Sequence, residues 1–117
     1  MGRILVVDDE PLICDLVHQW LVELECEMIG PASSVKGALS LIDTVPLDGA
    51  IVDVLLGGEN SYLVVDALRN RRIPFAFATG YSDESVTVRF PNTPILAKPF
   101  TFEDLRAAVA NFRKMPL

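Results

Sequence analysis

Five short apolar runs recur along this chain of 117 residues, and each one ends at polar or glycine residues. Ile4–Val7 consists only of Ile, Leu and Val, which is typical of a strand that is buried on both faces. The five expected strands are Ile4–Val7, Cys26–Gly30, Ala50–Val54, Pro74–Thr79 and Ile95–Ala97. A chain with several strands of this kind must cover both faces of its sheet.

Segments with helical periodicity lie between these runs. Pro11 suits the first turn of a helix, and apolar residues follow it at spacings of three and four. Ser33 or Ser34 is a suitable N-cap for a second helix. Asn60 or Ser61 starts a third helix after the third apolar run.

The last third of the chain is less regular. Thr101 and Asp104 form the pattern of a capping box, which predicts a final helix. In Ser82–Phe90, by contrast, Val86–Val88 are poor helix formers and Pro91 follows. We therefore expect a short or irregular fourth helix in this segment.

The alternation of strands with helices predicts an α/β fold, in which an open, doubly wound parallel sheet carries helices on both faces. The length suits one core, so residues 1–117 are expected to form a single domain. In such sheets, ligand sites lie beyond the carboxyl ends of the strands. Functional residues are therefore expected at that edge.

Charge, cysteine spacing and the length of the apolar runs argue against several classes of function. The chain has 16 acidic and 10 basic residues, and a net charge of −6 disfavours nucleic-acid binding. Cys14 and Cys26 lack the spacing of a metal motif and fit free thiols in a reducing compartment. No apolar run approaches the ~20 residues of a membrane helix, and no signal-peptide pattern opens the chain. We expect a cytoplasmic protein that binds neither nucleic acid nor membrane.

Polar residues stand at four of the five predicted strand ends. Asp8 and Asp9 follow the first strand, and Asp53 lies at the end of the third. Thr79 ends the fourth strand and Lys98 follows the fifth. Three carboxylates are costly to bury unless a cation neutralises them. Because the predicted ligands are oxygen atoms and no His or Cys motif accompanies them, the cation that fits is Mg²⁺. With a Lys and a Thr to bind phosphoryl oxygens, the pattern predicts phosphoryl transfer to a carboxylate.

These residues belong to motifs that occur in a fixed order along the chain. The motifs are Asp8-Asp9-Glu10-Pro11, the strand end at Asp53, Thr79-Gly80 and Lys98-Pro99-Phe100. Together they resemble the response-regulator receiver domains of bacterial two-component systems, over essentially the whole chain. The resemblance implies a flavodoxin-like receiver fold with strand order 2-1-3-4-5.

The resemblance also implies a role for each acidic residue. Asp53 would be the phosphoacceptor and, with Asp9, a direct ligand of Mg²⁺. Asp8 would bind the ion largely through water, and the backbone carbonyl of Leu55 would complete the protein ligands. Mg²⁺ is thus the expected cofactor.

In the same way, the resemblance implies that Lys98 pairs with the phosphoryl oxygens. Thr79 would move to bind the new phosphoryl group, and this movement would report phosphorylation. The Lys98–Pro99 peptide is expected to be cis, as is usual in the family.

The chain departs from the family at the switch. Most receivers carry an aromatic residue three positions before the lysine, where this chain has Ile95. The segment Phe75–Tyr81 instead resembles an atypical, often stand-alone subfamily with a Phe-Ala-Thr-Gly-x-Tyr-like signature. Our hypothesis is that Tyr81 partly replaces the missing switch aromatic.

The resemblance implies a receiver in a phosphorelay, with a histidine kinase or phosphotransfer protein as donor and slow self-hydrolysis as reset. It would not be an enzyme on external substrates, and it is expected to be a monomer or weak dimer. If the chain naturally ends after its last helix, it has no output domain, and its output is expected to be a protein contact or the drainage of phosphoryl groups from a relay. A receiver fragment of a hybrid histidine kinase remains an alternative.

Two other classes of function are weaker. A Mg²⁺-dependent phosphatase acting on an external substrate usually needs a second acid/base Asp near Asp53, and Asp53-Val54-Leu55 lacks one. An interaction module independent of phosphorylation would be favoured only if the acidic residues or Lys98 were missing. Both are present.

Overall fold

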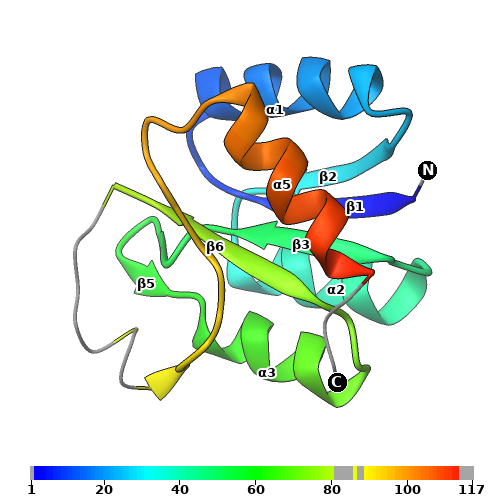
Figure 1. Cartoon of the computed structure of the whole chain (residues 1–117). Helices are drawn as coiled ribbons and strands as arrows, with labels where there is room; N and C mark the ends of the chain where they lie inside the picture. Colours follow the sequence, from blue (N-terminus) through cyan, green and yellow to red (C-terminus); the bar gives the residue numbers. More distant parts are fainter. Residues whose placement is uncertain (1, 81–85, 87–88, 114–117) are drawn as a thin grey trace.

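The computed structural model describes residues 2–80, 86 and 89–113. Its main sheet has five parallel strands in the order β2-β1-β3-β6-β7 (Figure 1). The strands are Arg3–Val7 (β1), Glu27–Ala32 (β2), Gly49–Val52 (β3), Phe75–Thr79 (β6) and Ile95–Ala97 (β7). Counted within this sheet alone, the order is 2-1-3-4-5. The predicted open, doubly wound sheet is therefore confirmed.

Helices cover both faces of the sheet. They are Pro11–Glu23 (α1), Val35–Thr44 (α2), Tyr62–Asn70 (α3) and Phe102–Phe112 (α5). Helices α1 and α5 lie on one face, and α2 and α3 lie on the other (Figure 1). None of the helices in the described residues is long and apolar enough to cross a membrane. The expected fourth helix in Ser82–Phe90 falls largely outside the described residues.

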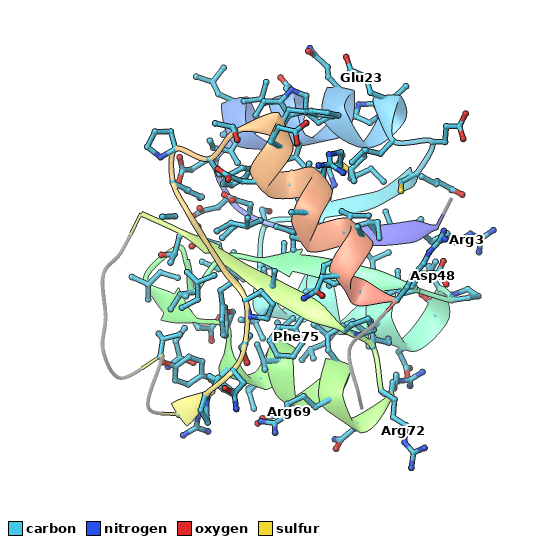
Figure 2. All side chains as sticks on the ribbon, in the orientation of Figure 1. Arg3, Glu23, Asp48, Arg69, Arg72 and Phe75 are labelled. Atoms are coloured by element: carbon cyan, nitrogen blue, oxygen red, sulfur yellow. The ribbon has the colours of Figure 1, made fainter. Side chains whose placement is uncertain are left out.

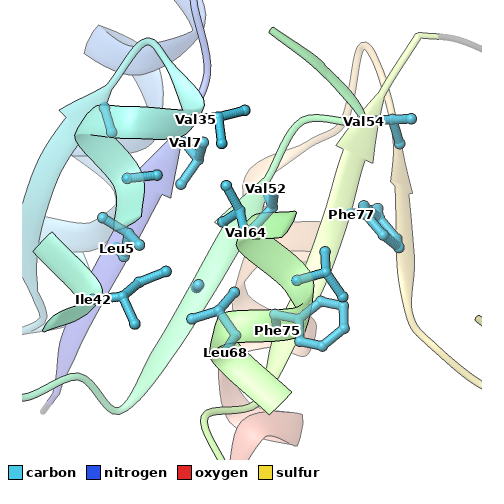
Figure 3. Close-up of a cluster of buried hydrophobic side chains, with 14 of the residues drawn as sticks. Leu5, Val7, Val35, Ile42, Val52, Val54, Val64, Leu68, Phe75 and Phe77 are labelled. Atoms are coloured by element: carbon cyan, nitrogen blue, oxygen red, sulfur yellow. The ribbon is translucent and has the colours of Figure 1, made fainter. Parts of the chain in front are cut away.

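Side chains fill the space between the sheet and its two helix layers (Figure 2). Leu5 and Val7 of β1 face the layer of α2 and α3, where they belong to one apolar cluster with Phe77 (Figure 3). Ile4 and Val6 belong to a second cluster on the opposite face, with residues of α1 and α5. Burial of each such side chain contributes roughly 1.5–3 kcal/mol. The continuous apolar runs in the sequence follow directly from this two-sided burial.

The helix starts differ in how their N-caps are used. The Ser34 side chain accepts a hydrogen bond of 3.0 Å from Gly37 N–H at the start of α2. At the start of α5, Thr101 and Asp104 form both hydrogen bonds of a capping box, which confirms that prediction. Ser61 is the N-cap of α3 but forms no side-chain cap bond.

Strand β2 extends further than the sequence pattern predicts. We expected it to end at Gly30, but the strand continues to Ala32. Proline is tolerated in this strand because β2 is at the edge of the sheet, where one side of the backbone has no ladder partner. The register with β1 shifts at this point, between Leu5 and Val7.

A small hairpin follows β3 and was not predicted. Leu55–Leu56 (β4) pairs antiparallel with Glu59–Asn60 (β5), and Gly57 and Gly58 form the turn. Both glycines have positive φ, +55° and +85°, as a type I′ hairpin turn requires at both positions, and residues other than glycine rarely adopt such φ values. The hairpin places an exposed turn beside the carboxyl edge of the sheet.

Candidate functional site

Backbone hydrogen bonds between strands bring the predicted polar residues to one edge. Asp53 N–H donates to the Val7 carbonyl at 2.8 Å, so Asp53 lies beside Asp8, the residue after Val7. Between the next two strands, β6 and β7, Lys98 N–H donates to the Thr79 carbonyl at 3.0 Å. The carboxyl ends of four neighbouring strands thus carry the four positions that the sequence predicted there.

The ammonium group of Lys98 lies among three carboxylates. Its Nζ is 2.8 Å from Asp8 Oδ2, 2.8 Å from Glu10 Oε1 and 3.1 Å from Asp53 Oδ2. Only 9% of the Lys98 side chain is exposed, and Asp8 and Asp53 are also buried. An ammonium group has three donors, so each of them can be matched to one carboxylate.

Burial and pairing act against each other in this cluster. Burial raises the pKa of Asp53 above its ordinary value, and the hydrogen bond from Lys98 opposes this only in part. Burial alone would lower the pKa of Lys98, but its hydrogen bonds to Asp8, Glu10 and Asp53 outweigh that effect and raise it. Lys98 is therefore a permanent cation at neutral pH.

The donor set fits a divalent metal ion. Carboxylate oxygens of Asp8, Glu10 and Asp53 lie within 4.8 Å of one another. Three carboxylates carry more negative charge than one lysine balances, and all the donors are hard oxygen atoms. Such a set suits Mg²⁺.

Asp9, which the resemblance makes a direct metal ligand, is not a member of this group. Its Oδ2 accepts a hydrogen bond of 2.9 Å from Gly57 N–H, in the turn of the β4–β5 hairpin. Leu55, expected to offer its carbonyl, donates its N–H to Asp53 Oδ1 over a long distance of 3.4 Å. The hairpin is thus connected to the site at Asp9 and at Asp53.

Glu10 takes part in the cluster, although the sequence pattern predicts no role for it. It is the N-cap residue of α1, and its backbone N–H donates to Asp8 Oδ1 at 2.9 Å. This turn directs its side chain back toward Lys98. The available signal in the sequence was the third acidic residue in the Asp8–Glu10 run.

The residues assigned to the switch are only partly described. Thr79 is buried at the end of β6. Ile95 is 46% exposed on β7, where it pairs with Phe77. Tyr81 lies outside the described residues. The Lys98–Pro99 peptide is cis, and so is Gly30–Pro31.

A doubly wound parallel sheet whose carboxyl edge joins two buried aspartates to a buried lysine defines a receiver domain. The sequence agrees, since residues 4–110 match the response regulator receiver domain family. The chain belongs to this family. The predicted resemblance is therefore confirmed at the level of the family.

Similar proteins include regulators and solved receiver structures. The chain is 27% identical to the transcriptional regulatory protein MalR of Bacillus subtilis over 120 residues, which cover 97% of the chain and 51% of MalR. It thus spans about half the length of this curated relative. MalR and the heme response regulator HssR of Staphylococcus saprophyticus, which is 30% identical over 109 residues, are both named as regulatory proteins.

Three solved structures are similar as well. SdrG from Sphingomonas melonis Fr1 is 44% identical, with a TM-score of 0.86 and 97% of each chain covered. SdrG from Pseudomonas melonis Fr1 in its BeF3-activated conformation is 46% identical, with a TM-score of 0.78 and 92% of each chain covered. The anti-anti-sigma factor PhyR of Bartonella quintana is 25% identical, with a TM-score of 0.79, over 95% of this chain and 47% of PhyR.

Proposed function

We propose that this receiver domain accepts a phosphoryl group on Asp53 in a two-component phosphorelay. The observation that carries the proposal is the buried contact between Asp53 Oδ2 and Lys98 Nζ, at 3.1 Å, inside a group of further carboxylates. A carboxylate at this position has a fixed cation beside it: burial raises its pKa, while the hydrogen bond from Lys98 opposes this effect and favours the ionised form. It can therefore act as a nucleophile.

The transfer would proceed by displacement at phosphorus. A carboxylate oxygen of Asp53 forms the new O–P bond, and the N–P bond of a phosphohistidine donor breaks, so that the imidazole leaves with the bonding electron pair. Lys98 stabilises the charge of the transferred group with an ammonium donor. By the resemblance, Asp9, Asp53 and the Leu55 backbone carbonyl would hold Mg²⁺ directly and Asp8 largely through water; the ion, when bound, would neutralise charge on the phosphoryl oxygens.

The proposed partners are proteins. A histidine kinase or phosphotransfer protein would supply the phosphoryl group, and phosphorylation would be read out through protein contact. The likeness to the anti-anti-sigma factor PhyR supports a protein target, since a sigma-factor regulator acts through other proteins. Thr79 and, by our hypothesis, Tyr81 would transmit the change at Asp53 to the surface.

The proposal is tested by measuring the intact mass of the protein after incubation with Mg²⁺ and acetyl phosphate, and in parallel with a phosphohistidine donor. We expect the mass of one phosphoryl group to be added to the wild-type chain. Asp53→Asn should add none, whereas Asp66→Asn, an exposed position on α3, should behave as wild type. Equal phosphorylation of wild type and Asp53→Asn, or no gain from either donor, would contradict the proposal.

A further inference from the structure

Glu10 differs from the other two carboxylates that contact Lys98. Its side chain is 55% exposed, compared with 3% for Asp8 and 10% for Asp53. It nevertheless approaches Lys98 Nζ to 2.8 Å, as closely as the buried Asp8 does. The exposed side chain of Glu10 therefore forms an ion pair with the buried Lys98.

The contacts of Asp8 and Glu10 show which of them can leave. Asp8 uses both carboxylate oxygens, because Oδ1 accepts from Glu10 N–H while Oδ2 meets Lys98. Within the described residues, the Glu10 carboxylate bonds only to Lys98. If Asp8 lost its contact with Lys98, its buried carboxylate would lack a charged partner, which is costly. If Glu10 moved away, its carboxylate would return to water.

All three donors of Lys98 are matched to carboxylates before any phosphoryl group arrives. When Asp53 is phosphorylated its carboxylate loses its negative charge and can release its donor, so a second phosphoryl oxygen gains a donor only when Asp8 or Glu10 gives one up. Resting on the proposed function, we propose that Glu10 is a positioning residue that competes with the phosphoryl group for Lys98. It holds the ammonium group beside Asp53 before transfer and is displaced into solvent when phosphoryl oxygens take its place.

The competition has a measurable consequence. Displacing Glu10 costs the free energy of its ion pair with Lys98, so removing its carboxylate should favour the phosphorylated form. The backbone turn that fixes Asp8 should survive a substitution, because Glu10 contributes its backbone N–H to that turn and its side chain makes no cap bond in α1. The effect can therefore be separated from unfolding.

The test uses beryllofluoride, a stable mimic of a phosphoryl group, titrated into the protein at saturating Mg²⁺ and followed by amide NMR shifts. Glu10→Gln should lower the apparent Kd by about two- to fivefold, the range expected for a half-exposed ion pair. Glu10→Asp, which keeps the charge on a side chain shorter by one carbon, should also lower the Kd because it cannot maintain the 2.8 Å contact. Glu23→Gln, at the far end of α1, removes the same charge and should leave the Kd unchanged (Figure 2).

Three results would overturn the inference. The first is a Kd of Glu10→Gln that equals or exceeds that of wild type. The second is a Kd of Glu10→Asp equal to that of wild type. The third is a decrease of the Kd in Glu23→Gln as large as that in Glu10→Gln. The last two would show an effect of overall charge rather than of the contact. If wild-type protein neither bound beryllofluoride nor accepted a phosphoryl group, the proposed function itself would fail. Binding by wild type with no gain in Glu10→Gln would reject only the role of Glu10.

Discussion

Asp53 occupies a position that favours chemistry at the expense of stability. Its carboxylate is buried at the end of β3, and burial raises its pKa above the ordinary value despite the hydrogen bond from Lys98. Because the folded pKa is higher than the unfolded one, the folded state holds the proton more tightly. The free energy of unfolding therefore falls as the pH rises through the interval between these two pKa values.

The Asp53→Asn substitution is therefore expected to stabilise the protein. In metal-free buffer at pH 7, the free energy of unfolding should rise by on the order of 1 kcal/mol, because a buried charge is removed while Lys98 keeps Asp8 and Glu10. The gain should disappear as the pH falls below the ordinary pKa of Asp, about 3.9. Urea denaturation at several pH values measures it. A loss of stability at pH 7, or a gain that does not depend on pH, would contradict the account.

For single residues, the sequence predicted the place in the fold better than the direction of the side chain. Asp8, Asp53 and Lys98 could be placed at one edge because each follows an apolar run, and strand ends meet in a parallel sheet. The sequence could not show that Glu10 turns toward Lys98 while Asp9 turns toward Gly57. That choice depends on the local turn after β1 and on the hairpin, and neither has a clear pattern in the sequence.

At the scale of elements, two serine N-caps offer a matched comparison. Ser34 caps α2 with a side-chain hydrogen bond, whereas Ser61 Oγ at the start of α3 is buried and has no partner among the described residues. Ser34→Ala should lower the free energy of unfolding by about 1 kcal/mol. Ser61→Ala should leave it unchanged or raise it by up to about 1 kcal/mol, since an unsatisfied buried hydroxyl is removed. Equal losses in both variants, measured by urea denaturation, would show that Ser61 has a partner in solution.

The contact of β3 with α5 gives a second prediction. A Cβ added at Gly49 would overlap Cδ2 of the Phe112 ring, so the side chain or the helix must move. Gly49→Ala should reduce the free energy of unfolding by about 1–3 kcal/mol, as expected for an overpacked core. The loss should be smaller when the same change is made in a Phe112→Leu protein. Additive losses in the double variant would rule out this contact as the cause.

The elements that the sequence predicted well have clear local patterns. The capping box of α5 and the apolar run of β1 are examples, because each depends only on neighbouring residues. The β4–β5 hairpin was missed because its strands contain two residues each, too few to show alternation. The extension of β2 to Ala32 was missed because Pro31 suggested a break, which an edge strand does not require.

For the whole molecule, stability and function are separated in space. Two apolar clusters, one on each face of the sheet, hold the helices, while the charged residues of the site gather at the carboxyl edge. The sequence predicted this organisation because alternating strands and helices allow few arrangements. Substitutions at the edge should therefore alter phosphorylation without unfolding the domain, which makes the central claim testable.

The central claim is that Asp53, and no other residue, receives the phosphoryl group. Borohydride reduces an aspartyl phosphate to homoserine, so trapping after phosphorylation and peptide mass analysis locates the acceptor directly. We predict homoserine at position 53 in the wild-type chain, and none in a sample reduced without a phosphoryl donor. Homoserine at Asp8 or Asp9 in place of position 53, or a phosphorylated protein with no homoserine at all, would contradict the account.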